Sequence, residues 1–132
     1  MQILLVEDHD DTRNVLSRLL DHCGHDVATA GTVAEALSLL EEVKFDALVC
    51  DIGLPDGDGF DLVWRALGEH RFQITVALTA LDSDNHRKLG QEAGFDHYLT
   101  KPLDFAKLRD VLQDAKIEHV QNEEKSVRIS VE

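Results

Sequence analysis

Cysteine, basic side chains and long apolar runs are all scarce in this 132-residue chain. Two cysteines are too few for a disulfide framework, and their spacing matches no common metal motif. Thirteen Lys and Arg against 26 Asp and Glu give a formal charge of −13, which argues against binding to nucleic acid or to anionic lipid. No apolar run approaches the ~20 residues that span a bilayer, and the N-terminus lacks the layout of a secretion signal. We therefore expect an acidic, cytoplasmic domain without a nucleic-acid or membrane partner.

Short apolar runs alternate with amphipathic helical patterns along most of the chain. The length and the 43% hydrophobic content suit one globular domain. The apolar runs predict strands near residues 2–6, 26–29, 47–51, 74–78 and 97–99. The helical patterns predict helices near residues 12–23, 32–43, 60–67, 83–93 and 105–117. Five strands alternating with five helices imply parallel crossovers, and so a doubly wound α/β fold. Residues 118–132 leave this pattern and are expected to form a helix extension or tail.

Polar side chains follow four of the five predicted strands. In chain order they are Glu7, Asp8, Asp51, Thr79 and Lys101. The carboxyl ends of parallel strands meet at one edge of the sheet, where doubly wound folds bind their ligands. We therefore expect these five side chains to form one site.

Three carboxylates at one edge of a sheet favour a bound cation; without one, either a pKa must rise or the groups must spread apart. If the first and third strands are neighbours, their ends lie about 4.8 Å apart. Two carboxylates about 4 Å apart repel by on the order of 4 kcal/mol at an effective dielectric of 20. Oxygen ligands favour a hard ion such as Mg²⁺, and one Mg²⁺ with Lys101 balances Glu7, Asp8 and Asp51. Phosphorylation of Asp51 would replace one negative charge by about two, an excess that Lys101 and Thr79 are placed to offset.

Each of these residues also has an ordinary explanation when it is taken alone. Glu7 and Asp8 suit a solvated loop or a helix N-terminus in so acidic a chain. Lys101 suits a surface, and Thr79 suits a hydroxyl bonded to the backbone at a strand end. Their coincidence at one edge favours a functional site.

The sequence resembles the receiver domain of two-component response regulators. The matching segments come in the family's order and spacing, and are Ile3–Asp8, Asp51–Gly59, Ala77–Ala80 and Tyr98–Leu103. The resemblance covers residues 2 to about 117, so we assign a receiver domain to residues 1–117. It implies a flavodoxin-like fold whose five strands lie in the order 2-1-3-4-5.

The resemblance also implies the chemistry of the site. Asp51 is expected to be the phosphorylation site, accepting a phosphoryl group from a phosphohistidine. Asp8, Asp51 and the Gly53 carbonyl are expected to hold Mg²⁺ directly, with Glu7 binding directly or through water. The phosphodonor is expected to be a histidine kinase or a histidine phosphotransfer domain. Receivers catalyse only their own phosphorylation and dephosphorylation, so we expect no other enzyme activity.

Three further residues are assigned by the same resemblance. Lys101 is expected to pair with Asp51 and later with the phosphoryl group, and its peptide bond to Pro102 is expected to be cis. Thr79 and Tyr98 are expected to act as switch residues when Asp51 is modified. The switched face would comprise the fourth helix, the fifth strand and the fifth helix. A weak or activation-dependent homodimer is also consistent with the resemblance.

Two alternatives to a phosphorylated receiver have different sequence marks. A receiver-like module that only binds proteins would usually lack the acceptor aspartate or the lysine, and here Asp51 and Lys101 are both present. A flavodoxin-like cofactor binder would need a phosphate-cradling loop after the first strand, whereas residues 7–11 are acidic apart from one histidine. The forms of the Asp51 and Lys101 motifs resemble receivers fused to hybrid histidine kinases.

Several other residues receive ordinary interpretations. We interpret residues 22–25, His-Cys-Gly-His, as a helix end and turn rather than a metal site. Cys50 is expected to be an inert core residue, and His9 to be solvated. Trp64 is expected to pack against the fold rather than to contact a partner.

Overall fold

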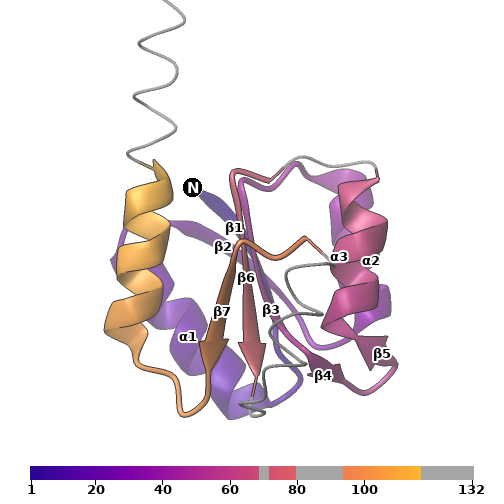
Figure 1. The fold of residues 1–132 in the computed structure, drawn as a ribbon, viewed down its shortest axis with the longest axis horizontal. Helices are drawn as coiled ribbons and strands as arrows, with labels where there is room; N and C mark the ends of the chain where they lie inside the picture. The colour runs from indigo at the N-terminus through magenta and orange to yellow at the C-terminus, as the bar shows by residue number, and fades with distance from the viewer. Residues whose placement is uncertain (69–71, 80–93, 117–132) are drawn as a thin grey trace, which may run out of the picture.

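The computed structural model describes residues 1–68, 72–79 and 94–116, and its centre is a five-stranded parallel sheet. The strands lie in the order β2-β1-β3-β6-β7 (Figure 1). Since β6 and β7 are the fourth and fifth strands of this sheet, the predicted order 2-1-3-4-5 is confirmed. Their bounds are Gln2–Val6 (β1), Asp26–Ala30 (β2), Ala47–Asp51 (β3), Ile74–Thr79 (β6) and His97–Thr100 (β7). Strands β3 and β6 are buried along their whole length, because both faces of the sheet are covered.

Four helices cover the two faces of the sheet in the described part of the chain. They are α1 (Asp10–His22), α2 (Val33–Glu42), α3 (Gly59–Leu67) and the helix of residues 105–116. The first and last pack on one face, and α2 and α3 pack on the other (Figure 1). The doubly wound fold is therefore confirmed. The helix predicted at 83–93 and the tail predicted at 118–132 lie outside the described residues.

Alternation along the strands divides the core into two layers. In β1, Leu4 and Val6 join the cluster under α2 and α3, whereas Ile3 and Leu5 join the cluster under α1. Cys50 lies in the first cluster and is fully buried, as predicted. None of the described helices is long and apolar enough to cross a bilayer.

The segment between β3 and α3 forms a short antiparallel hairpin, in which Gly53–Leu54 (β4) pairs with Gly57–Asp58 (β5). The hairpin leads directly into α3, whose first turn is capped by the Asp58 carboxylate accepting from the Asp61 amide at 2.8 Å.

Trp64 differs from its prediction, because its side chain is 68% exposed. Helix α3 turns Leu62, Val63 and Ala66 toward the core. Position 64 then falls on the outer side of the helix, so the expectation that Trp64 packs against the fold was wrong.

The turn after α1 matches its prediction as a helix end. Gly24 has a φ of +89°, a conformation that glycine adopts at little cost, and its amide donates to the Asp21 carbonyl. Cys23 is free and exposed, whereas His25 is buried. The His-Cys-Gly-His segment therefore closes α1.

His25 is expected to make the protein less stable as the pH falls below about 6.5. Burial lowers the pKa of His25, and the positive charges of the Met1 amino group and Lys116 lower it further. The folded state favours the neutral His25 ring. The contribution of this ring to the free energy of unfolding is therefore complete above the unfolded pKa, and it is lost as the pH falls through the folded pKa. Urea unfolding at pH 7.5 and pH 5.5 should show a smaller pH effect for His25→Gln than for the wild type. An equal pH effect in both proteins would contradict this assignment.

Candidate functional site

The ends of β1 and β3 bring the predicted acidic residues together. Val6 is the Cα partner of Cys50, so the chains leave the two strands side by side. Ligand atoms of Glu7, Asp8 and Asp51 all lie within 4.8 Å of one another, and the His9 imidazole joins the same group. Glu7 is fully buried and Asp51 is 6% exposed. The predicted convergence of the three carboxylates is present in the structure.

Lys101 completes the group from the end of β7. Its Nζ lies 2.9 Å from Asp51 Oδ2 and 3.2 Å from Glu7 Oε2. The Lys101 amide donates to the Thr79 carbonyl at 2.6 Å, which ties the residue to the end of β6. The Lys101–Pro102 bond is cis, as predicted. Lys101 therefore bridges two buried carboxylates that come from different strands.

The charges of this cluster alter its titration. Burial raises the pKa of Glu7 above its ordinary value, and the neighbouring Asp51 raises it further, while Lys101 partly opposes both effects. Burial would lower the pKa of Lys101, but Asp51 and Glu7 outweigh it and raise that pKa. The ammonium group is thus held in its charged form by the two carboxylates.

His9 is a member of this group that the sequence interpretation missed. Its ring is 71% exposed, as expected of a solvated histidine, yet its Nδ1 lies 3.0 Å from Glu7 Oε1 and 3.2 Å from Asp8 Oδ1. The hydrogen bond with Glu7, together with the charges of Asp8 and Glu7, raises the pKa of His9. Its position next to Asp8, just before α1, was the signal available in the sequence.

Two glycines lie close to Asp51, and the close approach of the backbone requires one of them, Gly59. The Gly53 amide donates to Asp51 Oδ1 at 3.3 Å. A Cβ at Gly59 would lie 2.6 Å from the Asp51 carbonyl oxygen, so only glycine fits there without a shift of the backbone. The glycine-rich segment after β3 therefore lets the chain fold back closely against the aspartate.

The two predicted switch residues lie on β6, the neighbour of β3, and on β7, one strand further. Thr79 ends β6 and is buried, one residue beyond Leu78, which is the Cα partner of Asp51. Tyr98 is the Cα partner of Ala77 and packs against the core cluster beneath α2 and α3. Its hydroxyl oxygen is buried and makes no hydrogen bond with the described residues.

The donor set of the pocket fits a hard divalent cation such as Mg²⁺. Asp8 Oδ1 is buried and accepts no hydrogen bond from the described residues, although the His9 ring lies 3.2 Å away as an ion-pair partner when it is protonated. The other carboxylates supply further oxygen ligands within 4.8 Å. A pocket of carboxylate oxygens suits such an ion.

Residues 3–113 match the response regulator receiver domain family. The chain therefore belongs to that family, as the resemblance of its motifs implied. This defines it as a signalling module of two-component systems.

The chain is similar to curated proteins of different lengths. It is 39% identical over 115 residues to an uncharacterized 14.6 kDa protein of Leptolyngbya boryana, covering 86% of this chain and 88% of that one. It is 36% identical over 117 residues to the transcriptional regulatory protein TrcR of Mycobacterium tuberculosis, covering 86% of this chain and 46% of TrcR. The chain thus spans most of one relative and about half of the other.

A solved structure supports the same assignment. The non-phosphorylated HemR receiver domain from Leptospira biflexa has a TM-score of 0.79 and 32% identity, with coverage of 86% of this chain and 92% of that one. The described fold and the family thus agree.

Proposed function

We propose that this protein is a phospho-accepting receiver, in which a phosphoryl group passes from a partner's phosphohistidine to Asp51 in a Mg²⁺-dependent reaction. The observation that carries the proposal is the 2.9 Å contact between Lys101 Nζ and Asp51 Oδ2 among buried carboxylates. The donor would be a histidine kinase or a histidine phosphotransfer domain. Lys101 is placed to offset a change of charge on Asp51, which supports Asp51 as the acceptor.

Four groups would hold the ion in this proposal. Asp8 and Asp51 supply carboxylate oxygens, the Gly53 carbonyl supplies a third ligand, and Glu7 binds directly or through water. Bound Mg²⁺ would neutralise charge on the phosphoryl oxygens during transfer. The buried Asp8 oxygen, which accepts no hydrogen bond from the described residues, supports this arrangement.

The transfer itself asks little covalent chemistry of the protein. An Asp51 carboxylate oxygen attacks phosphorus, the new P–O bond forms, and the P–N bond to the donor imidazole breaks. The electron pair of that bond leaves with the imidazole nitrogen. The Lys101 ammonium and the Thr79 hydroxyl would offset the additional negative charge on the product.

The signal would be a shift between two arrangements of the protein. Thr79 lies on β6, the neighbour of the Asp51 strand, and Tyr98 lies on β7, one strand further. The buried Tyr98 hydroxyl makes no hydrogen bond with the described residues, so a second arrangement that gives it a partner would be favoured. We propose that Thr79 moves toward the phosphoryl group and that Tyr98 changes rotamer. The face of the predicted fourth helix, β7 and the helix of residues 105–116 would then report phosphorylation to a partner.

An apolar groove beside Lys101 supports a helical donor. Val15 and Leu19 of α1 line it on one side, and Pro102 and Phe105 line it on the other. Val15 is 56% exposed, so apolar surface is available next to the reactive group. A donor helix that covered this groove would bring a phosphohistidine to the edge of the sheet.

A small phosphodonor tests the proposal without a protein partner. In the presence of Mg²⁺, acetyl phosphate is expected to add one phosphoryl group to the intact protein, measured by mass spectrometry. The Asp51→Asn variant and the chelated wild type are expected to remain unmodified. An unmodified wild type, with the donor verified as active on another receiver, would favour the non-phosphorylated binding module instead.

A further inference from the structure

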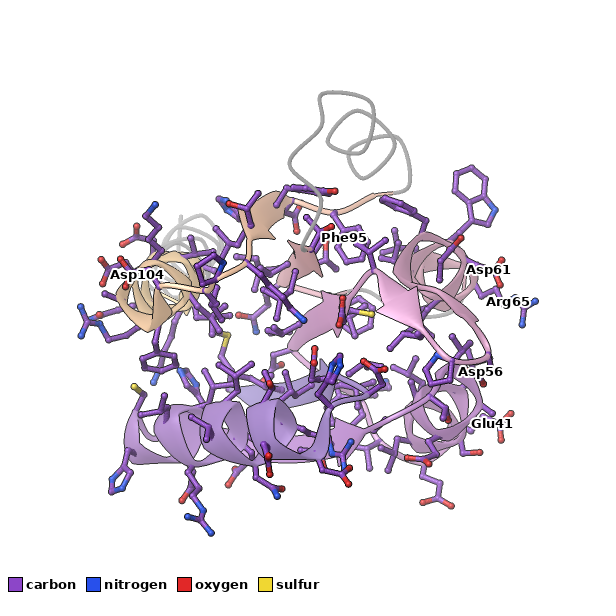
Figure 2. All side chains as sticks on the ribbon, turned by 90° about the horizontal axis from the view of Figure 1, so that it is seen from below. Glu41, Asp56, Asp61, Arg65, Phe95 and Asp104 are labelled. Carbon is purple, nitrogen blue, oxygen red and sulfur yellow. The ribbon has the colours of Figure 1, made fainter. Side chains whose placement is uncertain are left out.

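The hairpin after β3 is attached to a distant helix through one exposed carboxylate. Asp56 lies in the turn between β4 and β5, and its Oδ1 accepts from the Val33 amide at 2.8 Å. Its Oδ2 accepts from the Ala34 amide at 3.0 Å. Figure 2 looks onto the carboxyl ends of the strands and shows Asp56 beside α2. Both carboxylate oxygens are thus bonded to the first turn of a helix 23 residues earlier in the chain.

Helix α2 has a cap of its own and does not depend on Asp56 to begin. Thr32 is its N-cap, and the Thr32 hydroxyl accepts from the Glu35 amide at 3.1 Å. Glu35 reaches back to accept from the Gly31 amide at 3.0 Å. The Asp56 bonds also favour the ionised carboxylate, because hydrogen bonds from the Val33 and Ala34 amides lower the pKa of Asp56. The two bonds join the hairpin to α2 in addition to the usual cap.

The other end of the hairpin meets the phosphorylation site. Gly53, the first residue of β4, donates its amide to Asp51 Oδ1 at 3.3 Å. Gly53 is exposed and a Cβ built on it would meet nothing within 4 Å, so this residue has no packing of its own, although Ile52 is buried and Leu54 packs against the core cluster. At the far end, a Cβ on Gly57 would lie 3.3 Å from Val33 Cγ2, so the hairpin lies against α2 beside Asp56. The position of Gly53 therefore depends on how the hairpin is attached.

We infer that Asp56 is a positioning residue, which fixes the hairpin to α2 and thereby holds the Gly53 backbone against Asp51. This inference rests on the proposed function for its consequence, since Gly53 there supplies a carbonyl ligand to the ion. Without Asp56, the hairpin keeps its connections to β3 and α3 but loses both bonds to α2. The Gly53 amide and carbonyl would then sample several positions, and ion binding would have to order them.

Two variants of the full chain separate this role from helix capping. Asp56→Ala removes the carboxylate of the hairpin, whereas Thr32→Ala removes the cap of the same helix without touching the hairpin. In metal-free protein, the ¹⁵N order parameter of Gly53 is expected to fall from about 0.85 to below about 0.6 in Asp56→Ala and to stay high in Thr32→Ala. Mg²⁺ affinity by titration calorimetry is expected to fall roughly tenfold in Asp56→Ala only. Asp56→Asn, which keeps one acceptor oxygen, should lie between wild type and Asp56→Ala.

The outcomes of this experiment are distinct. A Gly53 that stays rigid in Asp56→Ala would overturn the inference, and so would an equal loosening in Thr32→Ala. Failure of the wild type to bind Mg²⁺ would instead count against the proposed function, because the order parameter of Gly53 is measured without metal and still decides the role of Asp56.

Discussion

Replacing Lys101 by methionine is expected to destabilise the metal-free protein by about 3 kcal/mol, because two buried carboxylates would lose their shared cation. Lys101 Nζ lies 2.9 Å from Asp51 and 3.2 Å from Glu7, and Glu7 is fully buried. Methionine keeps an apolar stem of similar length, so the loss would come from charge rather than from packing. Urea unfolding in the presence of a chelator measures this effect.

The same variant is expected to phosphorylate at least ~100-fold more slowly from acetyl phosphate, since it lacks the ammonium that offsets charge on the transferring group. Lys107→Met is the matched control, because Lys107 is an exposed lysine of the helix of residues 105–116. The control should change neither stability nor rate appreciably. A Lys101→Met protein that kept the stability and rate of the wild type would contradict the proposed role of Lys101.

Asp8→Asn is expected to stabilise the protein in the absence of Mg²⁺ and to leave it less stable than the wild type in the presence of Mg²⁺. Without metal, the substitution removes one of three neighbouring carboxylate charges and should stabilise the protein by about 1 kcal/mol. This figure lies below the ~4 kcal/mol of an ideal pair at 4 Å, because the Asp8 side chain is 27% exposed. With metal, the wild type should gain about 2.7 kcal/mol when the free Mg²⁺ concentration is 100 times its dissociation constant, whereas the variant gains little.

Thermal unfolding of both proteins, with chelator and with Mg²⁺, measures this reversal. Asp11→Asn is a suitable control, because Asp11 is exposed in the first turn of α1 and lies outside the group of potential ligands. The control should respond to Mg²⁺ like the wild type. If Asp8→Asn and the wild type were stabilised equally by Mg²⁺, Asp8 would not be a ligand.

Much of the site was predictable from the sequence because its residues are placed by strand ends. Asp51 ends the buried strand β3 and Lys101 directly follows β7, a partly exposed edge strand, and in a parallel sheet these strand ends meet at one edge. Burial on both faces gives the central strands continuous apolar runs, so their positions were found with small errors. β6 and β7 each extend one residue beyond the prediction, to Thr79 and Thr100.

The parts that were missed depend on contacts between segments distant in the sequence, or on the rotation of a helix. Asp56 stands in a turn-rich segment, where aspartate is common for local reasons, and its two bonds go to residues 23 and 22 positions away. His9 is mostly exposed, so no burial pattern distinguished it from a solvated side chain. Trp64 was misplaced because apolar neighbours in α3 suggested a wider buried face than the helix presents.

A crystal structure of the protein with Mg²⁺ and beryllofluoride tests the central claim most directly. The account predicts a beryllium–oxygen bond to Asp51, fluorine contacts from Lys101 and Thr79, and Mg²⁺ bound by Asp8, Asp51 and the Gly53 carbonyl. Beryllofluoride bound at another residue, or Mg²⁺ bound away from the Asp8–Asp51 pocket, would contradict it.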